Sequence, residues 1–275
     1  MKHIVGVSTN TYHGFTVEEA LKGISKAGFK YVELTAVTGW TEHVTSKMSD
    51  AELDEVRALL KKYDLTVMGL SGHCNLMDPE RLQDFSANIE LAAKLGCKFI
   101  ISSTGEAHNS TQENTQDELL VENLKKVLPL CEKHGLMLVL ETHGEHGTGA
   151  QLSKIVTMVG SKNLGINYDT ANVVFYGKQM PEDDIKKCAK EVAYVHLKDK
   201  GGKADEWDFP APGKGWLRLA ETLQYLDKEG FDGPLSTEIE FSEKFTMREK
   251  KPEDLAVVDA AVKDAFDFYK KHGYV

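Results

Sequence analysis

The sequence KHGLMLVLE, at residues 133–141, contains the pattern that decides the fold. Its first residues are typical of the end of an amphipathic helix, where a basic side chain suits the negative end of the helix dipole. Gly135 stands where a helix ends with positive φ, and an apolar run rich in β-formers then leads to Glu141. The stretch therefore predicts a helix, a short turn and a buried strand that ends in a carboxylate.

The same pattern recurs at Gly28, Gly96 and Gly230. Apolar runs predict eight strands, each followed by a helical segment, with no linker or low-complexity stretch. This order favours a closed (β/α)8 barrel that forms one domain over residues 1–275. An open doubly wound sheet is the alternative, but no Gly-rich phosphate turn follows any strand. The expected strands lie near residues 3–8, 30–35, 65–70, 97–103, 136–141, 164–169, 192–198 and 234–240.

Helix starts carry their own signals. A Ser or Thr that precedes a Glu by three residues predicts a capping box, and an Asp followed by Pro predicts an N-cap with proline in the first turn. The expected starts are Thr16 with Glu19, Ser49 with Glu52, Thr115 with Glu118, and Asp78 with Pro79.

Composition restricts the function classes. The 275 residues carry a net charge of −10, so nucleic acid is a poor default partner. No apolar run approaches the length of a membrane span, and the first residues are typical of a strand and not of a secretion signal. The four cysteines show no CxxC spacing, which predicts structural thiols, no disulfide framework and a cytoplasmic location.

Histidines gather where barrel enzymes place their chemistry, in the βα loops and at strand ends. A scatter of histidines over helix surfaces would not give this asymmetry. The histidines concerned are His13, His43, His73, His108, His143, His146 and His196.

Four consecutive strands end in potential metal ligands: Glu141, Asp169, His196 and Glu238. Taken singly, a Glu at a strand end is usually a rim residue, and a His on a strand is usually a hydrogen-bonded core residue. Three carboxylates in one barrel mouth would repel each other, and a divalent cation removes that repulsion. An oxygen-rich set with one imidazole suits Mn²⁺, Mg²⁺, Co²⁺ or Zn²⁺. Together, the four residues predict one divalent metal site.

Three motifs carry a resemblance to a known family: HLKD at 196–199, PGKG at 212–215 and GFDGPLSTE at 230–238. With them, nearly the whole chain resembles the xylose isomerase-like barrel superfamily, which includes hydroxypyruvate isomerase, ketose 3-epimerases and inositol-catabolism enzymes. The resemblance implies that Glu141, Asp169, His196 and Glu238 bind the metal, Mn²⁺ first among the candidates. It also implies that Glu141 and Glu238 are the catalytic acid–base pair. Glu240 competes with Glu238 because the two share a strand face.

The chain departs from the epimerase pattern at three positions. Asn172 stands where the epimerases have a His, Gly147 where they have a second Glu, and Gly202 where they have an Arg. Metal binding carries over from the resemblance, whereas the substrate and the particular proton-transfer reaction do not.

Other polar and aromatic rim residues are candidates for substrate contact. Glu33 is expected either to hydrogen-bond substrate hydroxyls or to form a rim salt bridge. His73 and His143 are expected either to act as acid–base or supporting groups or to be solvated loop histidines. An aromatic wall over the substrate is expected from Trp40, Phe175, Tyr176 and Trp207, with ordinary loop packing as the alternative. The full set of expected substrate contacts is Glu33, His73, His143, Asn172, Lys198 and Trp40.

The function implied is a divalent-metal-dependent isomerase or epimerase that acts on a sugar, sugar phosphate or related polyol through a metal-stabilised enediolate. A lyase or dehydratase on a keto-inositol or 3-keto-glycoside shares the first step and is the second candidate. A non-catalytic barrel or a subunit of a larger complex is an alternative of another class, and a DNA-repair endonuclease is disfavoured by the acidic composition. The expected partner is a small carbohydrate, with no nucleic acid and no membrane, and homo-oligomer formation stays open.

Overall fold

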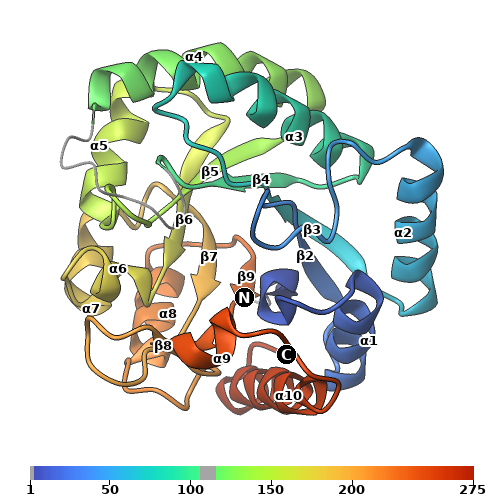
Figure 1. The fold of residues 1–275 in the computed structure, drawn as a ribbon. Helices are drawn as coiled ribbons and strands as arrows, with labels where there is room; N and C mark the ends of the chain where they lie inside the picture. Colours follow the sequence, from blue (N-terminus) through green and yellow to red (C-terminus); the bar gives the residue numbers. More distant parts are fainter. Residues whose placement is uncertain (1–2, 106–115) are drawn as a thin grey trace.

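The computed structural model describes residues 3–105 and 116–275. Eight parallel strands close into a barrel, in the order β1-β2-β3-β4-β5-β6-β7-β9 (Figure 1). The predicted barrel is therefore confirmed, and the open sheet is wrong. The barrel strands are β1 (Val5–Ser8), β2 (Tyr31–Thr35), β3 (Thr66–Ser71), β4 (Phe99–Ser102), β5 (Met137–Glu141), β6 (Leu164–Asp169), β7 (Val192–Leu197) and β9 (Leu235–Thr237).

Helices surround the barrel and join successive strands (Figure 1). The α-helices are α1 (Val17–Ala27), α2 (Asp50–Lys62), α3 (Leu82–Lys94), α4 (Asp117–His134), α5 (Gly149–Val159), α6 (Asn172–Phe175), α7 (Pro181–Asp184), α8 (Leu219–Lys228), α9 (Glu243–Met247) and α10 (Asp254–His272). Residues 3–105 and 116–275 also contain three 3₁₀ helices: η1 (Thr9–Tyr12), η2 (Pro79–Arg81) and η3 (Ile185–Lys187).

The local signals in the sequence place most helix ends. The four glycines of the repeated turn, Gly28, Gly96, Gly135 and Gly230, all adopt positive φ. The expected capping boxes begin α1 and α2, and Asp78 caps η2 ahead of α3. Thr115 and His108 lie outside the described residues. A further capping box, Thr148 with Gln151, begins α5 and was not predicted.

The eighth barrel strand is shorter than predicted. β9 ends at Thr237, whereas the sequence predicted a strand that continues to residue 240. The Glu238 N–H still donates to the Leu197 carbonyl of β7. After it the chain leaves the barrel, because the Ile239 N–H donates to the Thr11 hydroxyl and the Glu240 N–H donates to the Phe209 carbonyl.

A small antiparallel sheet beside the barrel was also not predicted. It pairs β8 (Asp208–Phe209), in the loop after β7, with β10 (Phe241–Ser242), after β9. Phe241 adopts a φ of 55°, which is uncommon for a bulky side chain. The sheet joins the two loops that follow the last two barrel strands.

Two apolar layers hold the barrel together. A small cluster contains Met68, Ile101, Val139 and Tyr194, and a much larger one spans the interface between strands and helices. All four cysteines are buried and free, as predicted for structural thiols. Among the described residues, no helix is long and apolar enough to cross a membrane.

Candidate functional site

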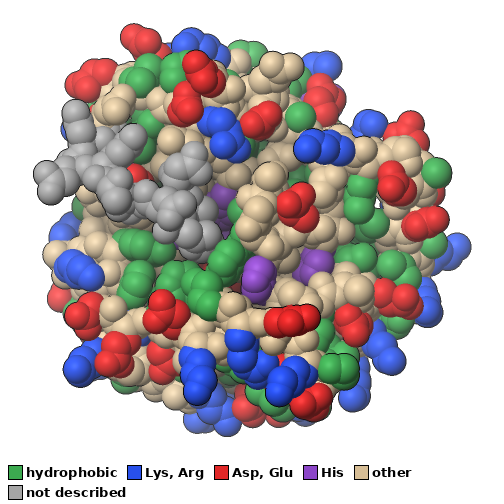
Figure 2. Space-filling model, in the orientation of Figure 1, with side chains coloured by type: hydrophobic (Ala, Val, Ile, Leu, Met, Phe, Trp, Pro, Cys, Tyr) green, Lys and Arg blue, Asp and Glu red, His purple; other side chains and the backbone are tan. Residues whose placement is uncertain are grey.

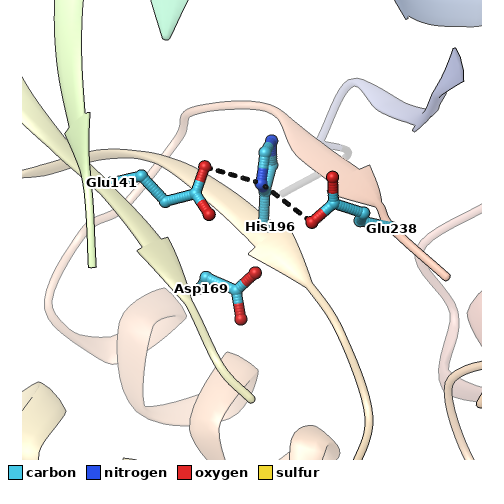
Figure 3. A group of neighbouring side chains, drawn as sticks. All are labelled: Glu141, Asp169, His196 and Glu238. Atoms are coloured by element: carbon cyan, nitrogen blue, oxygen red, sulfur yellow. Dashed lines mark ion pairs between the residues drawn. The ribbon is translucent and has the colours of Figure 1, made fainter. Parts of the chain in front are cut away.

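Four predicted metal ligands converge at the carboxyl ends of the last barrel strands. Glu141 ends β5, Asp169 ends β6, His196 lies near the end of β7, and Glu238 follows β9 directly. One ligand atom from each residue lies within 4.8 Å of those of the other three, and all four side chains are buried. Figure 3 shows His196 between the two glutamates, with Asp169 beside them. These residues are called the Glu–Asp–His–Glu group below.

The polar atoms of this group fit a cation. Oδ1 of Asp169 accepts the N–H groups of Ala171 and Asn172, at 2.9 and 2.7 Å, but Oδ2 is buried without a hydrogen-bond partner. Nδ1 of His196 is likewise buried without a hydrogen bond, 3.3 Å from Oε2 of Glu141. Buried polar atoms are rarely left unsatisfied in proteins. An oxygen and a nitrogen that both lack hydrogen bonds, together with two nearby carboxylates, are the donor set that a divalent ion takes.

Charge repulsion within the group also indicates a site for a cation. Burial, with the nearby Glu141 and Glu238 carboxylates, raises the pKa of Asp169 to about 8, although Lys198 and His196 oppose this. Burial acts to raise the pKa of Glu141 as well, but His196 and His73 hold it well below its ordinary value. Three carboxylates therefore do not all ionise at neutral pH without additional positive charge.

His196 is oriented by Glu33. Oε2 of Glu33 lies 2.9 Å from Nε2 of His196 and accepts a hydrogen bond of 2.8 Å from the Tyr194 hydroxyl. Burial alone would lower the pKa of His196, but Glu33, Glu141 and Glu238 together hold it well above its ordinary value. Of the two expectations for Glu33, a substrate contact or a salt bridge, the structure shows an ion pair with His196, with the Glu33 side chain fully buried.

Glu141 receives hydrogen bonds from three neighbours. Asn172 donates to Oε1 at 2.9 Å, and Asn167 donates to Oε2 at 3.3 Å. Nδ1 of His73 accepts the Ser103 N–H at 2.9 Å, so the proton of neutral His73 sits on Nε2, which lies 3.3 Å from Glu141. Both predicted rim residues, His73 and Asn172, thus touch a member of the Glu–Asp–His–Glu group.

Glu238 is held from the opposite side of the barrel mouth. Asn10, in η1, donates to Oε1 of Glu238 at 3.0 Å, and Nζ of Lys198 lies 3.0 Å from Oε2. Burial acts to raise the pKa of Glu238, but Lys198 and His196 lower it overall. Asn10 was missed by the sequence analysis, although its polar neighbours directly after the first apolar strand were a usable signal. Glu240, the competing candidate, pairs with Lys198 and does not belong to the group.

A cavity opens above the group at this end of the barrel. The space not filled by atoms, counted out into open solvent, is about 360 Å³. Figure 2 shows histidine side chains near the middle of this face. The lining residues are Asn10, Val37, Trp40, Ser71, His73, Glu141, His143, Lys198, Glu238 and Glu240.

The expected aromatic wall forms two separate clusters. Trp40 stacks on His13 at a centroid distance of 4.3 Å and donates from Nε1 to Oδ1 of Asn10. Phe175 packs against Trp207 and Phe209 instead, at 5.9 and 5.6 Å. Of these clusters, Trp40 lines the cavity.

The loop after β7 is fastened by one carboxylate that the sequence analysis did not single out. Asp199 accepts the N–H groups of Lys200, Gly213, Gly215 and Leu217 at 2.8–3.2 Å. These bonds bring the HLKD and PGKG motifs together. The two motifs lie at opposite ends of the loop, and the Asp199 carboxylate joins them. It thereby holds Lys198 and β8 beside the site.

Two departures from the epimerase pattern have a structural reason. A Cβ at residue 147 would lie within 2.9 Å of Tyr176 and Gly177, so a glutamate does not fit there without movement of the loop. Gly202 adopts a φ of 52°, which disfavours an arginine. At both positions, the local backbone of this chain therefore does not suit the larger epimerase residue.

Known proteins resemble this chain along most of its length. The sequence profile described as xylose isomerase-like TIM barrel matches residues 21–269. A Streptomyces coelicolor protein provisionally named hydroxypyruvate isomerase is 25% identical over 75% of this chain and 79% of its own. The inosose isomerase of Halalkalibacterium halodurans is 22% identical over 80% and 81%, and the inosose dehydratase of Geobacillus kaustophilus is 21% identical over 67% and 62%.

Solved structures show the same fold. A D-psicose 3-epimerase crystallised in the presence of D-fructose superposes with a TM-score of 0.77 at 18% identity, over 100% of both chains. A xylose isomerase-like TIM-barrel protein from Mycobacterium smegmatis, in complex with magnesium, superposes with a TM-score of 0.72 at 15% identity, over 96% of this chain and 98% of that one.

Proposed function

Because the chain belongs to the xylose isomerase-like TIM-barrel family, we propose that it is a divalent-metal-dependent isomerase or epimerase of a sugar, sugar phosphate or related polyol. The observation that carries the proposal is the Glu–Asp–His–Glu group, with two unsatisfied buried atoms, below a cavity at the carboxyl end of the barrel. The relatives include enzymes named isomerases, which supports this reaction class.

The group would hold one metal ion through Glu141, Asp169, His196 and Glu238. Bound there, a divalent ion supplies Lewis-acid polarisation of a substrate carbonyl and charge stabilisation next to it. We propose Mn²⁺, with Mg²⁺, Co²⁺ and Zn²⁺ as alternatives, because the donors are three carboxylates and one imidazole.

Glu141 and Glu238 are the proposed acid–base pair. Both line the cavity, and the pKa of each lies below its ordinary value, so each is ionised at neutral pH and is available as a base. Their positions on β5 and after β9 place them on two sides of His196 (Figure 3). In isomerisation, the carboxylate that takes a proton from substrate carbon returns it to the neighbouring carbon. In epimerisation, the other carboxyl group, protonated beforehand, gives its proton to the opposite face.

Epimerisation needs the two carboxylates in different states. The one that takes the proton must be ionised, and the one that gives a proton to the opposite face must carry it beforehand. Asn172 and Asn167 donate to Glu141, and Asn10 and Lys198 hold Glu238, so each carboxylate is fixed on its own side of the cavity.

Substrate contacts are proposed for the remaining polar lining of the cavity. His143 and Lys198 line it, and Trp40 offers a ring face stacked on His13. Rings with a polar edge suit a sugar, which presents both C–H faces and hydroxyl groups.

Dehydration is the second candidate, because one relative is named inosose dehydratase. It begins with the same proton abstraction and ends with loss of a β-hydroxyl instead of reprotonation. The two outcomes differ in product and not in the residues that start the reaction.

The test is a deuterium-exchange screen in D₂O. The Mn²⁺-loaded protein would be incubated with ketoses, inososes and 3-keto-glycosides, and each product analysed by NMR and mass spectrometry. An isomerase or epimerase introduces deuterium at the reacting carbon or yields a new sugar, whereas a dehydratase or lyase also releases water or the leaving group. Absence of exchange and turnover with all three classes, in protein that binds Mn²⁺, would refute the proposal.

A further inference from the structure

Lys198 places a buried ammonium among carboxylates. Its Nζ lies 3.0 Å from Oε2 of Glu238 and 3.8 Å from Oδ2 of Asp169, and it forms a closer ion pair with Glu240. The ring of Phe209 also contacts it, with the centroid 4.5 Å from Nζ. A buried charge is stable only where it is paired, and this one is paired several times.

The partners of Lys198 divide into two kinds. Glu238 and Asp169 belong to the Glu–Asp–His–Glu group, and the oxygen of Asp169 that faces Lys198 is the one without a hydrogen bond. Glu240 and Phe209 do not belong to the group. The Lys198 ammonium therefore neutralises part of the negative charge that a metal ion would neutralise. It also contacts Glu240 and Phe209, which are called its second set of supports below.

Glu240 is fixed for this purpose by three contacts. Asn10 donates to its Oε1 at 3.3 Å, its N–H donates to the Phe209 carbonyl, and its own carbonyl accepts a hydrogen bond from the Thr246 hydroxyl. The β8–β10 pairing places Phe209 opposite Phe241, the next residue in the chain. The second set of supports is thus a built feature of the loops after β7 and β9.

We infer that Lys198 is an internal cation that competes with the metal for Asp169 and Glu238, and that Glu240 and Phe209 are positioning residues that hold it aside when metal binds. The inference rests on the proposed metal site. It explains why Glu240, a further carboxyl side chain, lies beside the group without joining it. The ammonium neutralises the group before metal binds and then remains paired with Glu240.

The inference predicts that variants of Lys198 and of its supporting residues change the Mn²⁺ affinity in opposite directions. Lys198→Met should bind Mn²⁺ about tenfold more tightly or better, because no ammonium opposes the ion. Glu240→Gln should bind it about tenfold more weakly, because the ammonium then has no carboxylate outside the group. Phe209→Leu should weaken binding by about threefold or more, although it removes no charge.

The experiment is calorimetric titration of Mn²⁺ into metal-free protein, with and without Lys198. Glu240→Gln and Phe209→Leu would each be measured in the natural chain and in Lys198→Met. Lys200→Met is the matched control, since Lys200 is also buried and lies 5.2 Å from the Phe209 ring, but donates to the carbonyls of Gly201 and Asp208. Its Mn²⁺ affinity should be unchanged.

The expected result is that both weakening effects disappear in the Lys198→Met background. Equal weakening with and without Lys198 would overturn the inference, because it would mean that the ammonium is not involved. Unchanged affinity in Glu240→Gln alone would also overturn it, even where Lys198→Met does not fold. If the unaltered chain does not bind Mn²⁺ at all, the proposed metal function fails together with the inference; normal binding with unresponsive variants leaves that function standing.

Discussion

The two halves of the barrel mouth are built from different chemistry. The half formed by β5, β6, β7 and β9 presents three carboxylates and an imidazole toward one point. The half formed by β1 to β4 contributes Asn10, Trp40, Ser71 and His73 to the cavity, all without a fixed charge, and turns its carboxylate, Glu33, beneath His196. We infer that one half performs the chemistry, while the other orients it.

The difference has an energetic consequence. Charges in the first half are buried close together, and the pKa of Asp169 is raised to about 8 by burial and its acidic neighbours. An ionised Asp169 therefore costs stability at neutral pH in the absence of metal, as groups arranged for function commonly do. The second half presents no fixed charge to the cavity, so no such repulsion arises there.

The largest expected effect is that of Asp169→Asn, in the charged half. The variant should lose the metal, with an affinity at least about 100-fold lower, because it replaces a charged ligand by a neutral one. The metal-free variant should be at least as resistant to heat as the metal-free natural chain, because the amide carries no charge to bury. Elemental analysis and thermal melting test the two parts; full metal occupancy would remove Asp169 from the ligand set.

Glu238→Gln separates chemistry from metal binding within the same half. With metal occupancy restored and verified, proton abstraction should fall by about 10²–10⁴-fold, the usual contribution of a positioned general base. The rate of deuterium exchange into substrate measures it, with Glu141→Gln as the matched variant. Turnover close to that of the natural chain would assign the base to Glu141 or to a rim histidine such as His143.

Glu33→Gln tests the connection between the halves. Glu33 contacts His196 and lies outside the Glu–Asp–His–Glu group, so its loss should reduce metal affinity by about 10–100-fold, as is usual for a group that orients a ligand. Tyr194→Phe removes the other hydrogen bond to Glu33 and should have a smaller effect in the same titration. An unaltered affinity in Glu33→Gln would show that His196 needs no such support.

The smallest expected effect lies in the neutral half. Burial, with Lys250 and His43 nearby, lowers the pKa of His13 to about 4, below its ordinary value of 6.5. The unfolded chain therefore binds a proton that the folded chain does not, so this contribution to stability is present above about pH 6.5 and is lost as the pH falls toward 4. Urea unfolding of the metal-free chain and of His13→Gln across this window measures it. The same slope in both proteins would contradict the prediction.

The sequence predicted the half of the site that depends on strand ends. Apolar runs that stop at Glu141, Asp169 and His196 place those side chains at one end of the barrel, whatever the loops do. Glu33 was left open between a substrate contact and a rim salt bridge, because its strand position gives no indication of a partner at His196, far along the chain. Local patterns do not encode such contacts.

The loops after β7 and β9 were the least predictable part of the fold. The strands β8 and β10 are two residues long, too short for a periodic pattern, and Phe241 adopts a backbone conformation that its side chain disfavours. Their pairing depends on the Asp199 anchor and on the early end of β9. Both are tertiary effects, and both decide where Lys198 and Glu240 lie.

The anchor at Asp199 also makes the loop after β7 exchangeable. Its carboxylate gathers the N–H of Lys200 and those of Gly213, Gly215 and Leu217, so the loop leaves and rejoins the barrel at a single point. Between these ends, residues 202–206 are exposed. An insertion there would lengthen the wall of the barrel mouth without moving the residues that Asp199 holds. This segment is therefore where natural or engineered sequence change would alter substrate specificity with the least disturbance of the fold.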